Sequence, residues 1–95
     1  MSVLNFSYAT IKNAEAFSDY IRKASNLMAK EQVEVVVRGT YHETMRGAEK
    51  AQHVAAVFRY PDMETARTFY ASKAYQELIP LRDTACDMEI QFYEE

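Results

Sequence analysis

The sequence predicts an α+β fold of the ferredoxin-like kind, in which the elements follow one another as βαββαβ and both helical crossovers cover one face of an antiparallel sheet. Two observations support this prediction. The spacing of the apolar residues changes several times along the chain, from every second residue to about every 3.6 residues and back. The length of 95 residues is enough for one hydrophobic core, so residues 1–95 are expected to form a single domain.

The first strand and the first helix follow directly from this spacing. In VLNFSYAT, Leu4, Phe6 and Tyr8 alternate with smaller or polar residues, which is typical of a strand with one strongly apolar face. Asn13 is predicted to cap the helix that follows, because its side-chain oxygen can accept an amide hydrogen of the first turn. The apolar positions then recur at intervals of three and four residues, and the helix is expected to end near Lys30. These positions are Ala14, Phe17, Ile21, Ala24 and Met28.

The middle of the chain predicts a long β-hairpin. QVEVVVRG is rich in β-branched residues, and Gly39 marks the place where this strand is expected to bulge or bend before it continues through TYHETM. Strict alternation would place Val33, Val35 and Val37 on one face and Val36 on the other. Gly47 indicates a turn, and HVAAVFRY then forms the third strand, which Pro61 ends.

The C-terminal third predicts a second helical crossover and a fourth strand. Asp62 is the candidate cap of the second helix. Ser72 divides the stretch FYASKAYQELIPLRDTA and is expected to cap its second helical segment, while Pro80 is expected to kink that segment. CDMEIQFY then alternates cleanly, with Met88, Ile90 and Phe92 on one face.

One sheet face remains without helices in such a fold. It is expected to mix apolar with ionisable side chains, and these are His53, Ala55, Val57, Arg59, Glu89, Gln91 and Tyr93. Burial against a second copy is the economical solution, because a sheet face of roughly 800 Å² per partner suits a standard interface. The sequence therefore predicts a homodimer.

Composition argues against several classes of function. A net charge of −3 with scattered basic residues gives no footprint for nucleic acid, and no apolar run approaches the roughly 18 residues of a membrane span. The absence of a secretory leader pattern and a single cysteine, Cys86, favour a cytoplasmic location. Two histidines, one cysteine and two glycines provide neither a recognised metal-ligand spacing nor a phosphate loop, so no metal and no cofactor are expected.

Polar residues on the open sheet face are the first candidates for a site. His53 is a candidate general base, since desolvation and neighbouring charges tune the pKa of histidine. Arg59 shares its strand and face, and it could bind a developing anion. The alternative is that both side chains make hydrogen bonds across a dimer interface.

The second helical region and the hairpin supply the ligand-binding candidates. Tyr75 and Arg82 are seven residues apart and are predicted to share one helical face, where Arg82 forms either a structural ion pair or a clamp for an anionic ligand. Arg38 and Tyr41 are further candidates for contact with a ligand. Cys86 is expected to be a small core residue.

Two segments, VVVRG and VFRYPDMETARTFYASKAYQELIPLR, resemble the "domain of unknown function 1330" family, whose second helical region reads F-Y-x-S-x-x-Y-Q-x-x-x-x-x-R. The resemblance covers nearly the whole chain. It implies the dimeric α/β-barrel superfamily, in which two ferredoxin-like subunits pack sheet on sheet and which includes cofactor-free monooxygenases, isomerases and haem enzymes. The chain departs from the family pattern at Arg59, Thr40 and Lys73, which replace glutamate, glycine and proline.

Two hypotheses of function remain. The first is a cofactor-independent enzyme that acts by proton abstraction or by oxygenation of a small electron-rich substrate, using the cleft between helices and sheet. In it, His53 is the base, Arg59 or Arg82 binds the anion, and Tyr41 or Tyr75 orients the substrate. The second is a dimer without catalytic activity that binds a small acidic or aromatic metabolite or acts as an accessory protein.

Overall fold

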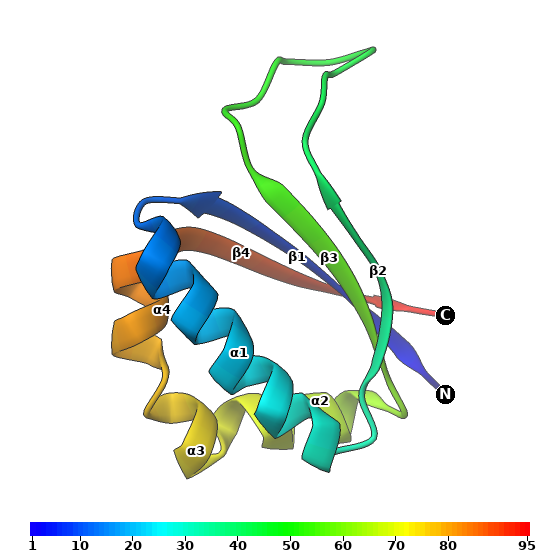
Figure 1. Ribbon diagram of the computed structural model, residues 1–95. Helices are drawn as coiled ribbons and strands as arrows, with labels where there is room; N and C mark the ends of the chain where they lie inside the picture. Colours follow the sequence, from blue (N-terminus) through cyan, green and yellow to red (C-terminus); the bar gives the residue numbers. More distant parts are fainter.

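The computed structural model describes all residues from Met1 to Glu95. Its four strands form one antiparallel sheet in the order β2-β3-β1-β4, and all helices lie on one side of it (Figure 1). This is the ferredoxin-like α+β fold, as predicted. The elements are β1 (Val3–Ile11), α1 (Ala14–Lys30), β2 (Glu34–Thr40), β3 (Val54–Tyr60), α2 (Met63–Ala71), α3 (Lys73–Gln76), α4 (Ile79–Ala85) and β4 (Cys86–Glu94).

The predicted helix caps are confirmed. The side chains of Asn13 and Asp62 each accept a hydrogen bond from the backbone N–H three residues further on, at 2.9 and 2.7 Å. Ser72 lies between α2 and α3 and serves both: its hydroxyl donates to the carbonyl oxygen of Phe69 and accepts from the N–H of Tyr75. These bonds satisfy backbone groups that helix ends leave without partners.

The hairpin differs from the prediction in two ways. β2 ends at Thr40 and does not continue through Met45. Tyr41 starts a loop that is held by hydrogen bonds between its own residues. Its carbonyl oxygen accepts a hydrogen bond from the side chain of Gln52, and its hydroxyl bonds to Thr44 at 2.7 Å. The loop extends beyond the sheet (Figure 1).

The second difference concerns the register of β2. The bulge lies between Val35 and Val37 and not at Gly39. Since an extra residue reverses the alternation, Val35 shares the face of Phe58 and Val37 shares the opposite face with Val57. The predicted placement of Val35 and Val37 on one side of the sheet is therefore wrong.

The helical stretch after Ser72 also differs in detail. It forms two short helices, α3 and α4, and Pro80 lies in the first turn of α4, where it kinks nothing. Proline suits that position because its missing N–H would have no partner within the helix anyway. None of the helices in the structure combines the length and the apolar composition that a membrane crossing requires.

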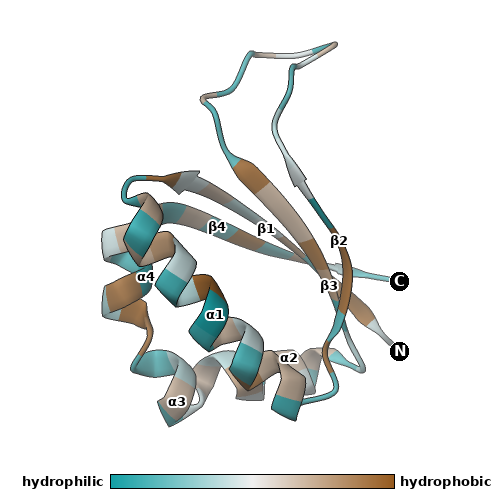
Figure 2. Cartoon of the chain, viewed as in Figure 1, coloured by the Kyte–Doolittle hydropathy of each residue, from teal (hydrophilic) through white to brown (hydrophobic).

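The two faces of the sheet have different surroundings. The inner face packs against the helices and contributes Val3, Phe58 and Tyr60 to the core. The outer face has no cover within the chain and holds Phe6, Val57 and Tyr93, whose strands pair in register. Figure 2 shows hydrophobic residues along β2 and β3, while much of the outward side of α1 is hydrophilic.

Candidate ligand-binding cavity

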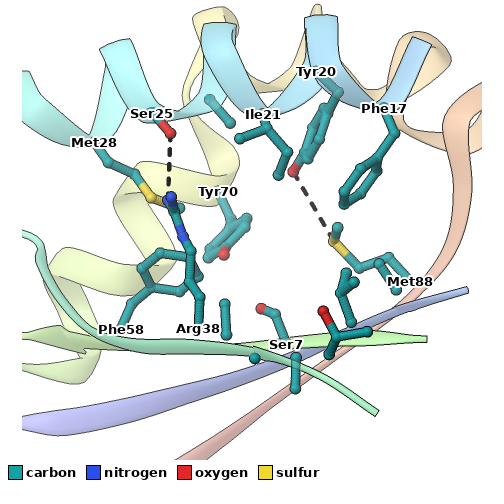
Figure 3. Close-up of a pocket in the computed structure, with 17 residues that line it drawn as sticks. Ser7, Phe17, Tyr20, Ile21, Ser25, Met28, Arg38, Phe58, Tyr70 and Met88 are labelled. Atoms are coloured by element: carbon teal, nitrogen blue, oxygen red, sulfur yellow. Dashed lines mark hydrogen bonds between the residues drawn. The ribbon is translucent and has the colours of Figure 1, made fainter. Parts of the chain in front are cut away.

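A cavity of about 360 Å³ lies between α1 and the inner face of the sheet (Figure 3). It forms because β1 and β3 place small residues, Ala9 and Ala56, opposite the helix, so the two layers do not fill the space between them. Twelve of its 17 lining residues are hydrophobic. The large ones include Phe17, Ile21, Met28, Phe58 and Met88.

The only charged residue that lines the cavity is Arg38, which is exposed to solvent. Its guanidinium lies 3.5 Å from the hydroxyl of Ser25 and 6.0 Å from the centre of the Phe58 ring. No carboxylate lies within ion-pair distance of it. No aspartate, glutamate, histidine, lysine or cysteine lines the cavity, so a bound anion meets one available positive charge and no acidic group.

Two hydroxyl groups, those of Ser7 and Tyr70, also line the cavity. Ser7 donates to the side-chain oxygen of the fully buried Asn5, whose amide nitrogen in turn donates to the hydroxyl of Tyr70 at 2.7 Å. The alternation of β1 explains this arrangement, since it directs Asn5 and Ser7 inward and the neighbouring Leu4, Phe6 and Tyr8 outward.

A second set of hydrogen bonds reaches the cavity from the helices. The guanidinium of Arg82 on α4 donates to the hydroxyl of Tyr75 on α3 at 3.2 Å. That hydroxyl lies 2.9 Å from the hydroxyl of Tyr20, which lines the cavity from α1 and contacts the sulfur of Met88 at 4.0 Å. Burial raises the pKa of Tyr20 far above its usual value of 10.0, so this residue remains a neutral phenol near pH 7.

Among the predicted ligand-binding residues, only Arg38 lines the cavity itself. Tyr75 and Arg82 approach one another as the spacing indicates, and they reach the cavity through Tyr20. Tyr41 lies outside it, in the hairpin loop. Hydrogen bonds from Thr44 and from the backbone of Lys50 lower the pKa of the Tyr41 phenol below its usual value.

The structure places His53 and Arg59 far from one another. The ring of His53 stacks on Tyr41 with 4.7 Å between ring centres, and its Nδ1 lies 2.7 Å from the carbonyl oxygen of Ala51. Arg59 lies six residues further along, which is roughly 20 Å in an extended strand. Neither residue lines the cavity, so the two do not form one site within the chain.

Arg59 is held in an ion-pair network on the outer face. Its guanidinium donates to Glu34 at 2.9 Å and twice to Glu95, at 2.7 and 2.9 Å. Glu95 also accepts a hydrogen bond from Ser2 at 2.7 Å. With Arg59 as the main cause, these bonds lower the pKa of Glu95 from 4.5 to about 2.

The Glu95 network predicts a pH-dependent contribution to stability. Because the folded state lowers the pKa of Glu95, the stabilisation is complete above about pH 4.5 and is lost as the pH falls towards 2. Urea denaturation should show Glu95→Gln to be less stable than the wild type at pH 7, with the difference shrinking below pH 4.5. Glu94→Gln is the matched control. An equal difference at pH 7 and pH 2.5 would show that the Glu95 charge plays no part.

Three residues that line the cavity, Ser7, Tyr20 and Tyr70, were not predicted from the sequence as candidates for a site. Two signals pointed to them. Asn5 and Ser7 are polar residues in a strand whose other side is strongly apolar, and Tyr20 lies four residues before Ala24 in the apolar stripe of α1. No group of three or more histidine, cysteine, aspartate or glutamate side chains converges to hold a metal ion.

Solved structures with similar folds come from several bacteria. A protein of unknown function, RPA0582 from Rhodopseudomonas palustris, has 15% identity and a TM-score of 0.87, covering 99% of this chain and 82% of its own. SnoaB, a cofactor-independent oxygenase from Streptomyces nogalater, has 13% identity and a TM-score of 0.74, covering 99% and 92%. A protein of unknown function and possible oxidoreductase from Bacteroides thetaiotaomicron has 12% identity and a TM-score of 0.63, covering 99% and 97%.

Because all three identities are low, these likenesses establish the fold alone. No curated protein matches the sequence. The model of one protein family, described as "Domain of unknown function (DUF1330)", matches residues 3–95. The match spans every strand and helix described above. The chain therefore belongs to the DUF1330 family.

Proposed function

We propose that this protein binds a small aromatic carboxylate in the cavity between α1 and the sheet, and that it does so as a homodimer joined through the outer face. The single observation that supports ligand binding most strongly is the cavity itself, which is mainly apolar and is lined by one arginine without an acidic partner and by several hydroxyl groups. Such a combination is typical of small-molecule sites.

The cavity determines the size and polarity of the ligand. A volume of about 360 Å³ is near the lower end of the range of roughly 300–1,000 Å³ for ligand pockets. It suits one or two aromatic rings with short substituents. The rings of Phe17 and Phe58 and the side chains of Met28 and Met88 offer flat and polarisable contacts to such a ring.

Arg38 determines the charge of the ligand. A guanidinium binds a carboxylate with two parallel hydrogen bonds, and Arg38 forms no ion pair that would compete. Its weak contact with Ser25 and its position over Phe58 hold it at the cavity. We therefore assign the carboxylate of the ligand to Arg38 and its ring to the apolar lining.

Binding can be tested with 4-hydroxy-3-nitrobenzoate, an aromatic acid whose absorbance reports binding. Ala24 is buried and lines the cavity, so Ala24→Leu should fill part of it and weaken binding at least tenfold, about 1.4 kcal/mol. Arg38→Gln should weaken binding roughly tenfold to a hundredfold, since a hydrogen bond to a charged group contributes about 1.5–3 kcal/mol. The dissociation constants of the wild type and of both variants are measured by isothermal titration calorimetry.

The matched control for cavity filling is Ala29→Leu. Ala29 lies on the same helix but is exposed and outside the cavity, so the same added volume should leave binding unchanged. Unfolding curves confirm that each variant is folded. Equal affinities of Ala24→Leu and Ala29→Leu would contradict binding in this cavity.

A second candidate function is a cofactor-independent oxygenase or isomerase, which the similarity of fold to SnoaB favours. Since no general base lines the cavity, a substrate there must be acidic enough to ionise without one. In such an oxygenase the ionised substrate is itself the reductant: it is oxidised by O₂, one oxygen atom enters the product and the other leaves as water. The proposed role of His53 as base requires the hairpin loop to approach the ligand, and a loss of O₂ uptake in His53→Gln would support it.

A further inference from the structure

The hydroxyl of Tyr75 forms hydrogen bonds with both Arg82 and Tyr20. The chemistry of the three side chains determines which group donates in each bond. An arginine side chain carries donors only, so the hydroxyl oxygen of Tyr75 must accept the bond from Arg82. Tyr75 is fully buried, and the hydrogen of its own hydroxyl has one remaining acceptor within reach, the oxygen of Tyr20 at 2.9 Å. A buried hydroxyl hydrogen without an acceptor is costly, so Tyr75 donates to Tyr20.

This direction leaves the hydroxyl hydrogen of Tyr20 available to the cavity. Its acceptor in the structure is the sulfur of Met88 at 4.0 Å, which also lines the cavity (Figure 3). A thioether sulfur is a weak acceptor. An oxygen atom of a bound ligand is a better one, and it would replace the sulfur without breaking the bonds that hold Tyr20.

We propose that Tyr20 donates a hydrogen bond to a carbonyl or phenolate oxygen of the ligand, and that Arg82 is a positioning residue that acts on Tyr20 through Tyr75. This inference deepens the proposed binding function and rests on it. It names the ligand class more closely, as an aromatic acid with a second oxygen substituent. The carboxylate binds Arg38, and the second oxygen binds Tyr20.

The two polar groups reach the cavity at different positions along α1. Ser25, which contacts Arg38, follows Tyr20 by five residues on α1, which corresponds to about 7.5 Å along the helix axis. Figure 3 shows the guanidinium of Arg38 beside Ser25, to the left of the hydroxyl of Tyr20, which points towards Met88. Two oxygen-bearing substituents in para positions on a benzene ring point in opposite directions, so one can face Arg38 while the other faces Tyr20.

The charge of Arg82 makes Tyr20 a better donor than an isolated phenol. Donation from a guanidinium polarises the hydroxyl of Tyr75, which in turn polarises that of Tyr20, and the effect is stronger in the low dielectric of the interior. The side chain of Arg82 is 21% exposed, and its carboxylate partner, Asp83, is 63% exposed and mostly in solvent. The positive charge is therefore only partly offset on the side that faces Tyr75.

The test uses the pKa of the bound probe. The phenol of 4-hydroxy-3-nitrobenzoate changes its absorbance on ionisation, so its pKa in the complex is measured directly by titration from pH 5 to 9. A donor at the phenolate oxygen favours the ionised form, whereas the apolar lining favours the neutral one, so the bound pKa should lie about one unit below the value it has when that donor is removed. Tyr20→Phe should remove most of this shift, and Tyr75→Phe and Arg82→Met should each remove part of it.

The comparison between variants isolates the role of Tyr20. The other polar groups at the cavity, including Arg38 and Tyr70, are unchanged in all three variants. Arg82→Lys keeps the charge and should recover part of the shift that Arg82→Met loses. Tyr8→Phe, on the outer face, is the matched control. Should Arg82→Met fail to fold, Tyr75→Phe still breaks the connection while keeping the ring.

The possible failures are distinct. If the wild type binds the probe and depends on Arg38, but Tyr20→Phe leaves both the affinity and the bound pKa unchanged, the role of Tyr20 is wrong and the binding function stands. If Arg82→Met and Tyr75→Phe lower the melting temperature but leave the pKa of the bound probe unchanged, Arg82 and Tyr75 are purely structural. If the wild type binds no aromatic acid, the proposed function and this inference are both overturned.

Discussion

Replacing Phe6 with aspartate is expected to convert the proposed homodimer into particles with the 11.0 kDa mass of one chain. Phe6 lies in the middle of the outer face, opposite Val57 on one side and Gln91 on the other, and its ring packs edge-on against Tyr93 at 5.1 Å. A carboxylate here would be buried without a partner on association. Such a charge costs several kcal/mol, so the dimer dissociation constant should rise at least a hundredfold.

Sedimentation equilibrium at micromolar concentration measures this effect. Ala29→Asp is the control, because Ala29 is exposed on the helical side of the sheet and should not affect association. The apolar content of the outer face supports the expectation, since Val36, Val37 and Tyr93 are between 41% and 56% exposed in the single chain. A wild type that sediments as one chain, or a Phe6→Asp variant that remains dimeric, would contradict the proposed interface.

The largest effect on folding is expected for Tyr75→Ala. Tyr75 is fully buried and its ring packs against Phe69 and Tyr70, with ring centres at 5.5 and 4.7 Å. Truncation of a buried aromatic residue costs about 3–5 kcal/mol. A small domain has a net stability of about 5–15 kcal/mol, so the variant should be close to unfolding.

Tyr75→Phe separates packing from hydrogen bonding. It keeps the ring and removes only the hydroxyl that bonds to Arg82 and Tyr20, so it should destabilise the fold by about 1–3 kcal/mol. Urea denaturation of both variants gives the two free energies of unfolding. Equal losses for Tyr75→Ala and Tyr75→Phe would mean that the hydroxyl and not the ring dominates.

Most of the fold could be predicted because local physics determines it. Asn13, Asp62 and Ser72 cap helices through bonds that span only three residues, and the alternation in β4 follows from the pleat of a strand. The bulge between Val35 and Val37 could not be predicted in this way. A run of three valines satisfies either register, so pairing with β3 decides which side chain points inward.

The site was harder to predict, since a cavity forms where side chains from distant segments leave space. The sequence predicted that Arg82 and Tyr75 lie close together, because residues seven apart share one face of a helix. The place of Tyr20 in the site could not be predicted, because its hydrogen-bond partners, Tyr75 and Met88, are 55 and 68 residues away in the sequence. His53 and Arg59 were predicted to share a strand and a face, but His53 precedes β3 and lies six residues before Arg59, too far for one site within the chain.

The location of the bound ligand can be measured through the methionine methyl groups. The chain has five methionines, of which Met28 and Met88 line the cavity and Met1, Met45 and Met63 do not. With ¹³C-methyl-labelled methionine, titration with 4-hydroxy-3-nitrobenzoate should shift the signals of Met28 and Met88, which should also show Overhauser effects to the ring protons of the probe. Saturable binding that leaves these two signals unchanged would contradict the assignment of the cavity as the ligand site.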